Sequence, residues 1–193
     1  MSTAAVAAPT RTGQVLADLL PASRVRDIAL VVGGAALTGL AAQIAVPVPG
    51  SPVPVTGQTF AALLVGTALG AGRGVAALAL YALAGLAGVP WFAGGSHGIG
   101  VSFGYILGML LASAAVGALA RRGADRSMPR MAGTMLVGSA IIYAVGVPYL
   151  ALSAGMSFSA AVAAGLTPFL IGDALKAALA MGLLPTAWKL LDK

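Results

Sequence analysis

The stretch TPFLIGDALK, residues 167–176, places two charged side chains inside an otherwise apolar segment. Asp173 and Lys176 are the only charged residues between Arg130 and Lys189. They lie three residues apart, so on a helix they share one face. A charge inside a bilayer costs roughly 2.5–3.5 kcal/mol on insertion scales, and such residues face a protein interior or a cavity. The pair therefore predicts a ligand or ion site, with mutual neutralisation of the two charges as the alternative.

The start of this helix sets the depth of the charged pair in the membrane. Thr167 suits the N-cap position, and Pro168 suits the first helical position, where its missing N–H costs nothing. At 1.5 Å per residue, Asp173 lies about 9 Å and Lys176 about 13 Å below that start. The pair is thus expected nearer one membrane face than the other.

The composition identifies the class of protein. The chain has 193 residues, of which 59% are hydrophobic and 8% are charged, whereas a soluble domain carries roughly 25% charged residues. It is expected to be an all-α integral membrane protein surrounded by membrane lipid. The net charge of +6 does not indicate nucleic-acid binding, because the basic residues are confined to short loops and termini. With no cysteine and His97 as the single histidine, no metal site is expected.

Apolar runs and charged loops together predict the topology. Residues 1–27 are interpreted as a cytoplasmic N-terminal segment, and residues 28–193 as a single domain, a bundle of six transmembrane helices. Arg73 is expected at the turn of a short helical hairpin, the alternative being one buried helix broken at the neighbouring glycines. Lysine and arginine are absent from three loops, which lie at 47–57, 90–100 and 151–158. By the positive-inside rule, these loops lie outside and both termini are cytoplasmic.

Three segments are expected to surround the charged pair at the outer face. The proline-rich loop 47–57 is extended and is interpreted as a lid, or else as a connector. The loop 90–100 is rich in glycine, which permits close approach of backbone to a ligand. The candidate ligand-binding residues are Asp173, Lys176, Gln58, Trp91, Phe92, Gly94 and Tyr105.

This combination of residues suits a small molecule with an apolar body, a carboxylate and amide-like donors. Lys176 is the natural partner of a carboxylate, and Asp173 can accept N–H groups of a urea or amide. Catalysis is not expected, and no catalytic residue is assigned: the chain has no second membrane aspartate, no Ser/His/Asp set and no Walker motif.

Small residues recur along the first apolar run, at Ala35 and Gly39 and at Ala41 and Ala45. In lipid, a stripe of small residues lets a second helix approach closely. These four residues are interpreted as a face that docks a partner helix, and packing within the chain is the open alternative.

Three ordered motifs give the sequence a resemblance to the BioY family. They are PVPVTGQT at 52–59, GVPWFAGG at 88–95 followed by GYILG at 104–108, and PFLIGDALK at 168–176. BioY proteins are the biotin-specific, substrate-capture (S) components of energy-coupling-factor (ECF) transporters. The resemblance implies a six-helix bundle in the cell membrane of a bacterium or archaeon, which takes biotin from the outer face.

The resemblance also implies a set of partners. They are a transmembrane coupling protein, which docks on the small face of the first helix, and two cytoplasmic ATPase subunits. The chain itself would need no cofactor, since only the partners use ATP. Two alternatives remain open at this point: an S component for another vitamin, and a standalone channel or secondary transporter.

Overall fold

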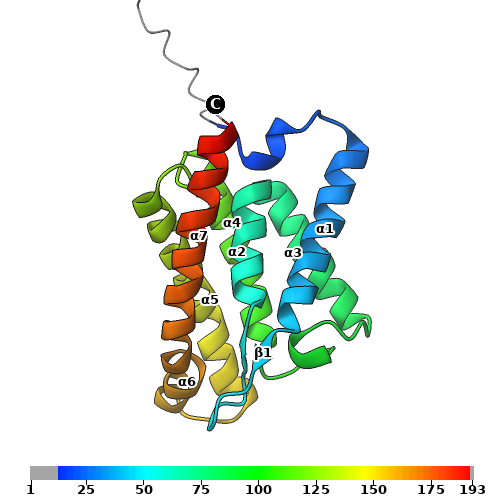
Figure 1. The fold of residues 1–193 in the computed structure, drawn as a ribbon. Helices are drawn as coiled ribbons and strands as arrows, with labels where there is room; N and C mark the ends of the chain where they lie inside the picture. Colours follow the sequence, from blue (N-terminus) through cyan, green and yellow to red (C-terminus); the bar gives the residue numbers. More distant parts are fainter. Residues whose placement is uncertain (1–12, 192–193) are drawn as a thin grey trace, which may run out of the picture.

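The computed structural model describes residues 13–191, in which long helices lie roughly along one direction (Figure 1). A short N-terminal turn leads into them, and a two-stranded hairpin and a short helix close the opposite end. The elements in chain order are η1 (Leu16–Leu19), α1 (Arg24–Ala42), β1 (Ala45–Val46), β2 (Val55–Thr56), α2 (Gln58–Leu69), α3 (Ala71–Leu86), η2 (Ala93–Gly95), α4 (Phe103–Arg121), α5 (Met128–Ser153), α6 (Phe158–Gly165), η3 (Thr167–Phe169) and α7 (Leu170–Leu191).

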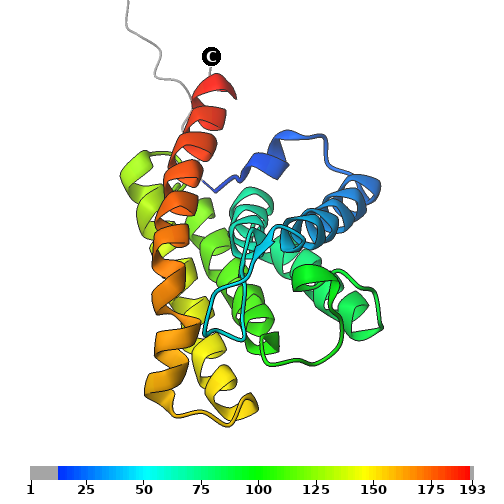
Figure 2. The same ribbon diagram turned by 60° about the horizontal axis from the view of Figure 1, so that its bottom comes forward.

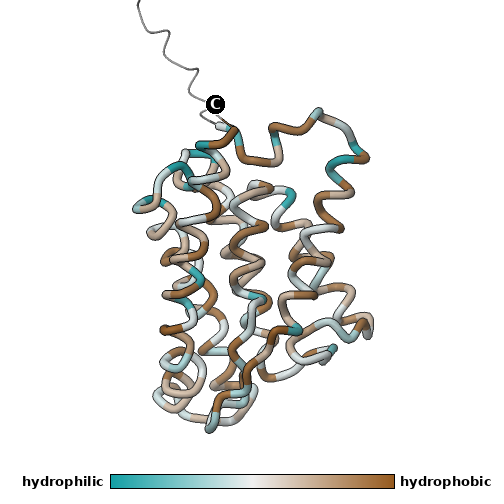
Figure 3. The backbone as a smooth tube through the Cα atoms, in the orientation of Figure 1, coloured by the Kyte–Doolittle hydropathy of each residue, from teal (hydrophilic) through white to brown (hydrophobic). Residues whose placement is uncertain are grey.

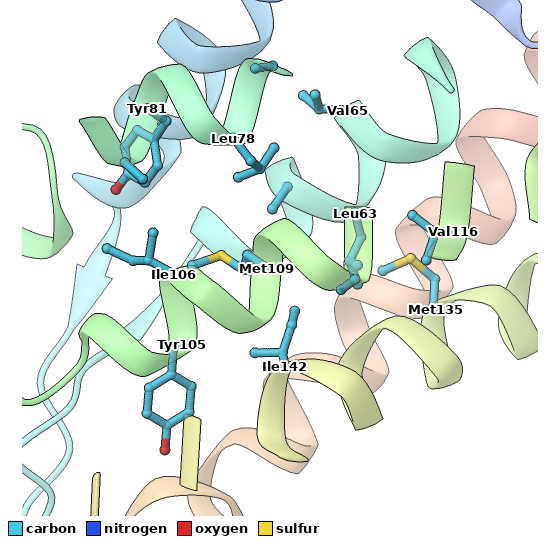
Figure 4. Packing of buried hydrophobic residues seen from close by; sticks show 14 of the residues in the cluster. Leu63, Val65, Leu78, Tyr81, Tyr105, Ile106, Met109, Val116, Met135 and Ile142 are labelled. Carbon is cyan, nitrogen blue, oxygen red and sulfur yellow. The ribbon is translucent and has the colours of Figure 1, made fainter. Parts of the chain in front are cut away.

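Helix α4 forms the centre of the bundle, packing against α2, α3 and α5. Figure 4 shows Met109 of α4 between Leu78 of α3 and Ile142 of α5. Small residues allow this close approach: a Cβ on Gly117 would lie 2.3 Å from the backbone nitrogen of Ala71. Close backbone contact at small residues is how helices associate in lipid.

Helices α2 and α3 form the hairpin that the sequence predicts, and not one broken helix. Gly70 alone connects them, with φ at 81°, a left-handed conformation that favours glycine. Gly66 and Gly74 lie four residues before and after Gly70. A Cβ on Gly74 would lie 2.8 Å from the Cα of Gly66. The two helices therefore run side by side, and Arg73 lies in the first turn of α3.

The first helix ends earlier than the apolar run, which continues to Val46. Ala45 and Val46 are instead extended and pair antiparallel with Thr56 and Val55. Val46 precedes Pro47, and a residue before proline is disfavoured in helical conformation. The loop 47–57 is thus largely the tip of a β-hairpin, not an unpaired extended segment.

The approach to the charged pair differs from the sequence prediction in one detail. Ser157 caps α6 by accepting from the Ala160 N–H at 3.2 Å. Thr167, however, does not cap α7, because its hydroxyl donates back to the Val162 carbonyl at 3.3 Å. Residues 167–169 form a 3-10 turn, and α7 begins only at Leu170. Asp173 consequently lies in the first turn of α7.

Four stretches are long and apolar enough to cross a membrane, among the residues that the structure describes: α1, α4, α5, and α6 together with α7. Helices α2 and α3 are shorter, with 12 and 16 residues. Hydrophilic colours gather mainly at the end that holds the C-terminus (Figure 3). The β-hairpin and α6 lie at the opposite end of the bundle (Figure 1).

Candidate ligand site

A cavity lies where the β-hairpin, α2, α4, α5 and α7 meet. Its volume is about 40 Å³, enough for a few water molecules and far below the 300–1,000 Å³ of most ligand pockets. Turned so that this end comes forward, the bundle has α7 at its edge, with the hairpin strands between α7 and α1 (Figure 2). The lining residues are Val53, Pro54, Thr56, Gln58, Thr59, Phe92, Ala93, Ser102, Tyr105, Ile106, Met109, Tyr143, Phe169, Asp173 and Lys176.

The charged pair forms one wall of this cavity. The Lys176 ammonium donates to one carboxylate oxygen of Asp173 at 3.2 Å and to the Thr59 hydroxyl at 2.8 Å. The Tyr143 hydroxyl donates to the other carboxylate oxygen of Asp173. Both charged side chains are about 15% exposed, so solvent screens their attraction only weakly. Lys176 thus joins α7 to α2, and Asp173 joins α7 to α5.

Aromatic rings form the apolar side of the cavity. Tyr105, Tyr143 and Phe169 pack together with centroid separations of 6.4–6.5 Å. The Tyr105 hydroxyl donates to the Gly165 carbonyl at 2.8 Å, which ties α4 to the end of α6. Phe92 closes the cavity from the 90–100 loop and is 4% exposed. Apolar walls with a few convergent polar groups are typical of small-molecule sites.

Five of the seven predicted ligand-binding residues line the cavity: Asp173, Lys176, Gln58, Phe92 and Tyr105. Trp91 and Gly94 do not. The Trp91 indole N–H donates to the Tyr81 carbonyl at 3.0 Å, and its ring packs against α1. Gly94 lies exposed in η2.

The hairpin contributes Val53, Pro54 and Thr56 to the cavity wall, which favours the lid interpretation over a mere connector. Sequence reasoning missed Thr59, Tyr143 and Phe169. Phe169 stands four residues before Asp173, one helical turn away, so the helical period could have indicated it. Tyr143 gave no distinct signal, because it is one of several hydroxyl side chains on α5.

The small-residue stripe of α1 lies mostly inside the protein. Ala35 is 1% exposed and Gly39 is buried. A Cβ on Gly39 would lie 2.8 Å from the Trp91 ring. Ala41 is half-buried and Ala45 lies in β1, outside the helix. This arrangement favours packing within the chain, the alternative left open by the sequence.

A protein-family model identifies the family of this chain. The model that describes the BioY family matches residues 11–193. The chain belongs to the BioY family.

Several BioY proteins are similar along most of the chain. A probable biotin transporter BioY from Pyrococcus horikoshii is 36% identical over 162 residues, which is 82% of this chain and 93% of the relative. The biotin transporter BioY2 of Lactococcus lactis is 33% identical over 160 residues, 81% of this chain and 87% of the relative. The fold matches the crystal structure of the S-component for biotin from an ECF-type ABC transporter. The TM-score is 0.77, with 21% identity, covering 88% of this chain and 95% of the other.

Proposed function

We propose that this BioY protein is the biotin-capturing S component of an ECF-type importer and is not an enzyme. The observation that carries the proposal is the position of Lys176 and Asp173 in the wall of an aromatic cavity. The similar BioY proteins are named as biotin transporters, which supports biotin as the ligand.

The chemistry of biotin suits this wall. Lys176 would bind the ligand carboxylate by a charge-assisted hydrogen bond. The rings of Tyr105, Phe92 and Phe169 would cover the apolar body. With a volume of about 40 Å³, the cavity has to widen before it holds such a ligand. The hairpin and the seam between α2 and α7, joined by the bond from Lys176 to Thr59, are the walls that would move.

The direct test has two parts. The purified chain should bind biotin, measured by calorimetry, and biotin should co-purify with it. Cells unable to make biotin should then take it up through this chain only when a coupling protein and ATPases are co-expressed. Preference for a different vitamin in a ligand panel would contradict the ligand assignment. Uptake without any ATPase would instead indicate a standalone transporter.

We also propose that α1–α5 and α7 all cross the cell membrane of a bacterium or archaeon, with both termini cytoplasmic. Supporting this, Arg73, Arg121 and Arg126 bond to residues 13–18 near the N-terminus, so the basic residues gather at one end. The chain lacks cysteine, so single cysteines report topology cleanly. Ser96→Cys should react with an impermeant thiol reagent from outside, and Met128→Cys should not; the reverse pattern would contradict this orientation.

A coupling protein would meet α1 on its exposed side, and a matched pair of glycines tests this. Gly33 is exposed, and a Cβ added there would have no atom within 4 Å, whereas a Cβ on Gly39 would abut Trp91. Gly33→Leu should block assembly with the coupling protein and leave biotin binding intact. Gly39→Leu should instead destabilise the chain itself by about 1–3 kcal/mol, as overpacking does. Co-purification with the coupling protein and thermal unfolding distinguish these results. Assembly unaffected by Gly33→Leu would place the partner elsewhere.

A further inference from the structure

A second cavity lies behind the wall formed by Asp173 and Tyr143. It runs between α5 and α7, has a volume of about 360 Å³, and is lined mainly by apolar residues such as Leu136, Ala140 and Ala174. Asp173 and Tyr143 line both this cavity and the ligand cavity. These two side chains therefore form the partition between the ligand site and a groove between two helices of the bundle.

Within this partition, the Asp173 carboxylate is shared between two donors. The neutral Tyr143 hydroxyl of α5 bonds one oxygen, and the Lys176 ammonium of α7 bonds the other at 3.2 Å. The Tyr143 ring is held at near right angles to Tyr105, with centroids 6.4 Å apart, and edge-on to Phe169 at 6.5 Å. Packing thus fixes where the hydroxyl lies, so the hydrogen bond to Asp173 is set by contacts within the protein.

The two hydrogen bonds to Asp173 affect how the site can bind the carboxylate of a ligand. The carboxylate of a ligand can bind Lys176 fully only if the hydrogen bond from Lys176 to Asp173 weakens. A carboxylate that loses a partner in a dry site is costly unless another donor compensates it. Tyr143 is positioned to be that donor.

We propose that Tyr143 is a positioning residue: by holding Asp173, it frees Lys176 for the carboxylate of the ligand. The proposal rests on the proposed function and adds the control of specificity for acids over their neutral amides. Without the hydroxyl, Asp173 depends on Lys176 alone, and an incoming carboxylate must displace a stronger pair.

The variant Tyr143→Phe removes the hydroxyl and keeps the ring that forms the partition. Its affinity for biotin should fall roughly tenfold, the value of one hydrogen bond to a charged group. Its affinity for biotin amide should change less than about twofold, since the neutral amide does not compete with Asp173 for the Lys176 ammonium. Tyr149→Phe, on the same helix but packed against Phe103, should alter neither affinity. Equal losses for acid and amide, or no loss for the acid, would overturn the proposal.

A measurement without ligand separates this proposal from the assignment of biotin. In the empty protein, Lys176→Met should lower the unfolding temperature more in the Tyr143→Phe background than in the parent. The reason is that Asp173 loses both of its side-chain donors in the double variant, whereas it keeps Tyr143 in the single variant. Strictly additive effects in this cycle would show that the two donors do not share Asp173, whatever the ligand is. Failure of the parent to bind biotin would contradict the proposed function alone.

Discussion

The two ends of this bundle use the same residue types in different ways. At the hairpin end, Asp173 and Lys176 border a cavity and bond mainly to each other and to two hydroxyl groups. At the end that holds the C-terminus, the ionic groups bond to backbone carbonyls and to one another across several segments. A charge beside a cavity can exchange its partner for a ligand, whereas a charge that bonds to several segments of the chain holds those segments together.

The second end is a network centred on Asp18 and Arg73. Arg73 bonds to Asp18, to Asp27 at 3.2 Å and to the Leu69 carbonyl at 3.1 Å. Arg121 bonds to Asp18 at 3.2 Å and to the Gly13 carbonyl at 2.9 Å. These bonds join the N-terminal segment to the α2–α3 turn and to the end of α4.

A buried carboxylate joins α7 to the same end. Asp125 is 0% exposed and accepts the Trp188 indole N–H at 2.6 Å. The Arg126 guanidinium lies 3.4 Å from the centre of the Trp188 ring, a cation–π contact, and also bonds to the Gln14 carbonyl. Burial raises the pKa of the Asp125 carboxyl, while the Trp188 N–H and Arg126 oppose that shift.

The largest effect should come from Lys176→Ala. Truncating one member of a buried charge pair costs about 2–5 kcal/mol, so biotin affinity should fall roughly 30- to several-thousand-fold. Biotin amide should bind the parent poorly and lose much less on this substitution, because it lacks the carboxylate that is proposed to bind Lys176. A calorimetric cycle of both proteins with both ligands measures the coupling. Additive losses would show that Lys176 does not bind the carboxylate. Asp173 and Lys176 would then have a structural role, like the network of Asp18 and Arg73.

Trp188→Phe tests the opposite end and should affect stability instead of affinity. Leaving the buried Asp125 oxygen without its donor costs about 1–3 kcal/mol. The unfolding midpoint in detergent should fall by roughly 2–4 °C per kcal/mol for a chain of this size. Trp91→Phe is the matched control, since it removes an N–H from a neutral carbonyl and should destabilise less. A change in the biotin affinity of Trp188→Phe would show that the two ends are not independent.

The smallest effect concerns pH and again contrasts two carboxyls. Burial acts to raise the pKa of Asp18, but the Val15 N–H, Arg73 and Arg121 together lower it below 3.8. Asp18 therefore stabilises the fold above about pH 3.8, and this contribution is lost as pH falls through its lowered pKa. Asp125, with a raised pKa, destabilises the fold at neutral pH, and this penalty is relieved as pH falls through that pKa.

The measurement is the unfolding midpoint between pH 7 and pH 3. Asp18→Asn should lower the free energy of unfolding at pH 7 by at most about 1 kcal/mol, and with it the midpoint. It should also reduce the loss of stability at acidic pH. Asp125→Asn should reduce any gain seen on mild acidification. A parallel shift of both curves at every pH would contradict this assignment of the two carboxyls.

Local rules predicted much of this molecule. Lysine and arginine placement predicted the hairpin at Arg73, and the spacing of Asp173 and Lys176 predicted their shared face. The first two sequence motifs contain Gln58, Phe92 and Tyr105, which line the cavity. These predictions depend on features carried by neighbouring residues.

The sequence says less about contacts between distant segments. Trp91 is an aromatic residue in a glycine-rich loop, as is typical of ligand sites, yet its ring fills the space beside Gly39 of α1. Tyr143 reaches Asp173 because α5 packs against α7, and no local pattern in the sequence indicates that pairing. Thr167 has the side chain of an N-cap, but the turn after α6 directs its hydroxyl to Val162.

The unequal helix lengths also have a mechanical consequence for the surrounding bilayer. Helix α3, with 16 residues, spans about 24 Å, whereas α5, with 26 residues, spans about 39 Å. The hydrocarbon core of a bilayer is about 30 Å thick. Lipids beside α3 would have to thin and those beside α5 would have room to thicken, unless the protein tilts. Under the proposed topology, the hydrophobic thickness of the protein would therefore differ between α3 and α5, and its tilt would shift with the acyl-chain length of the surrounding lipids.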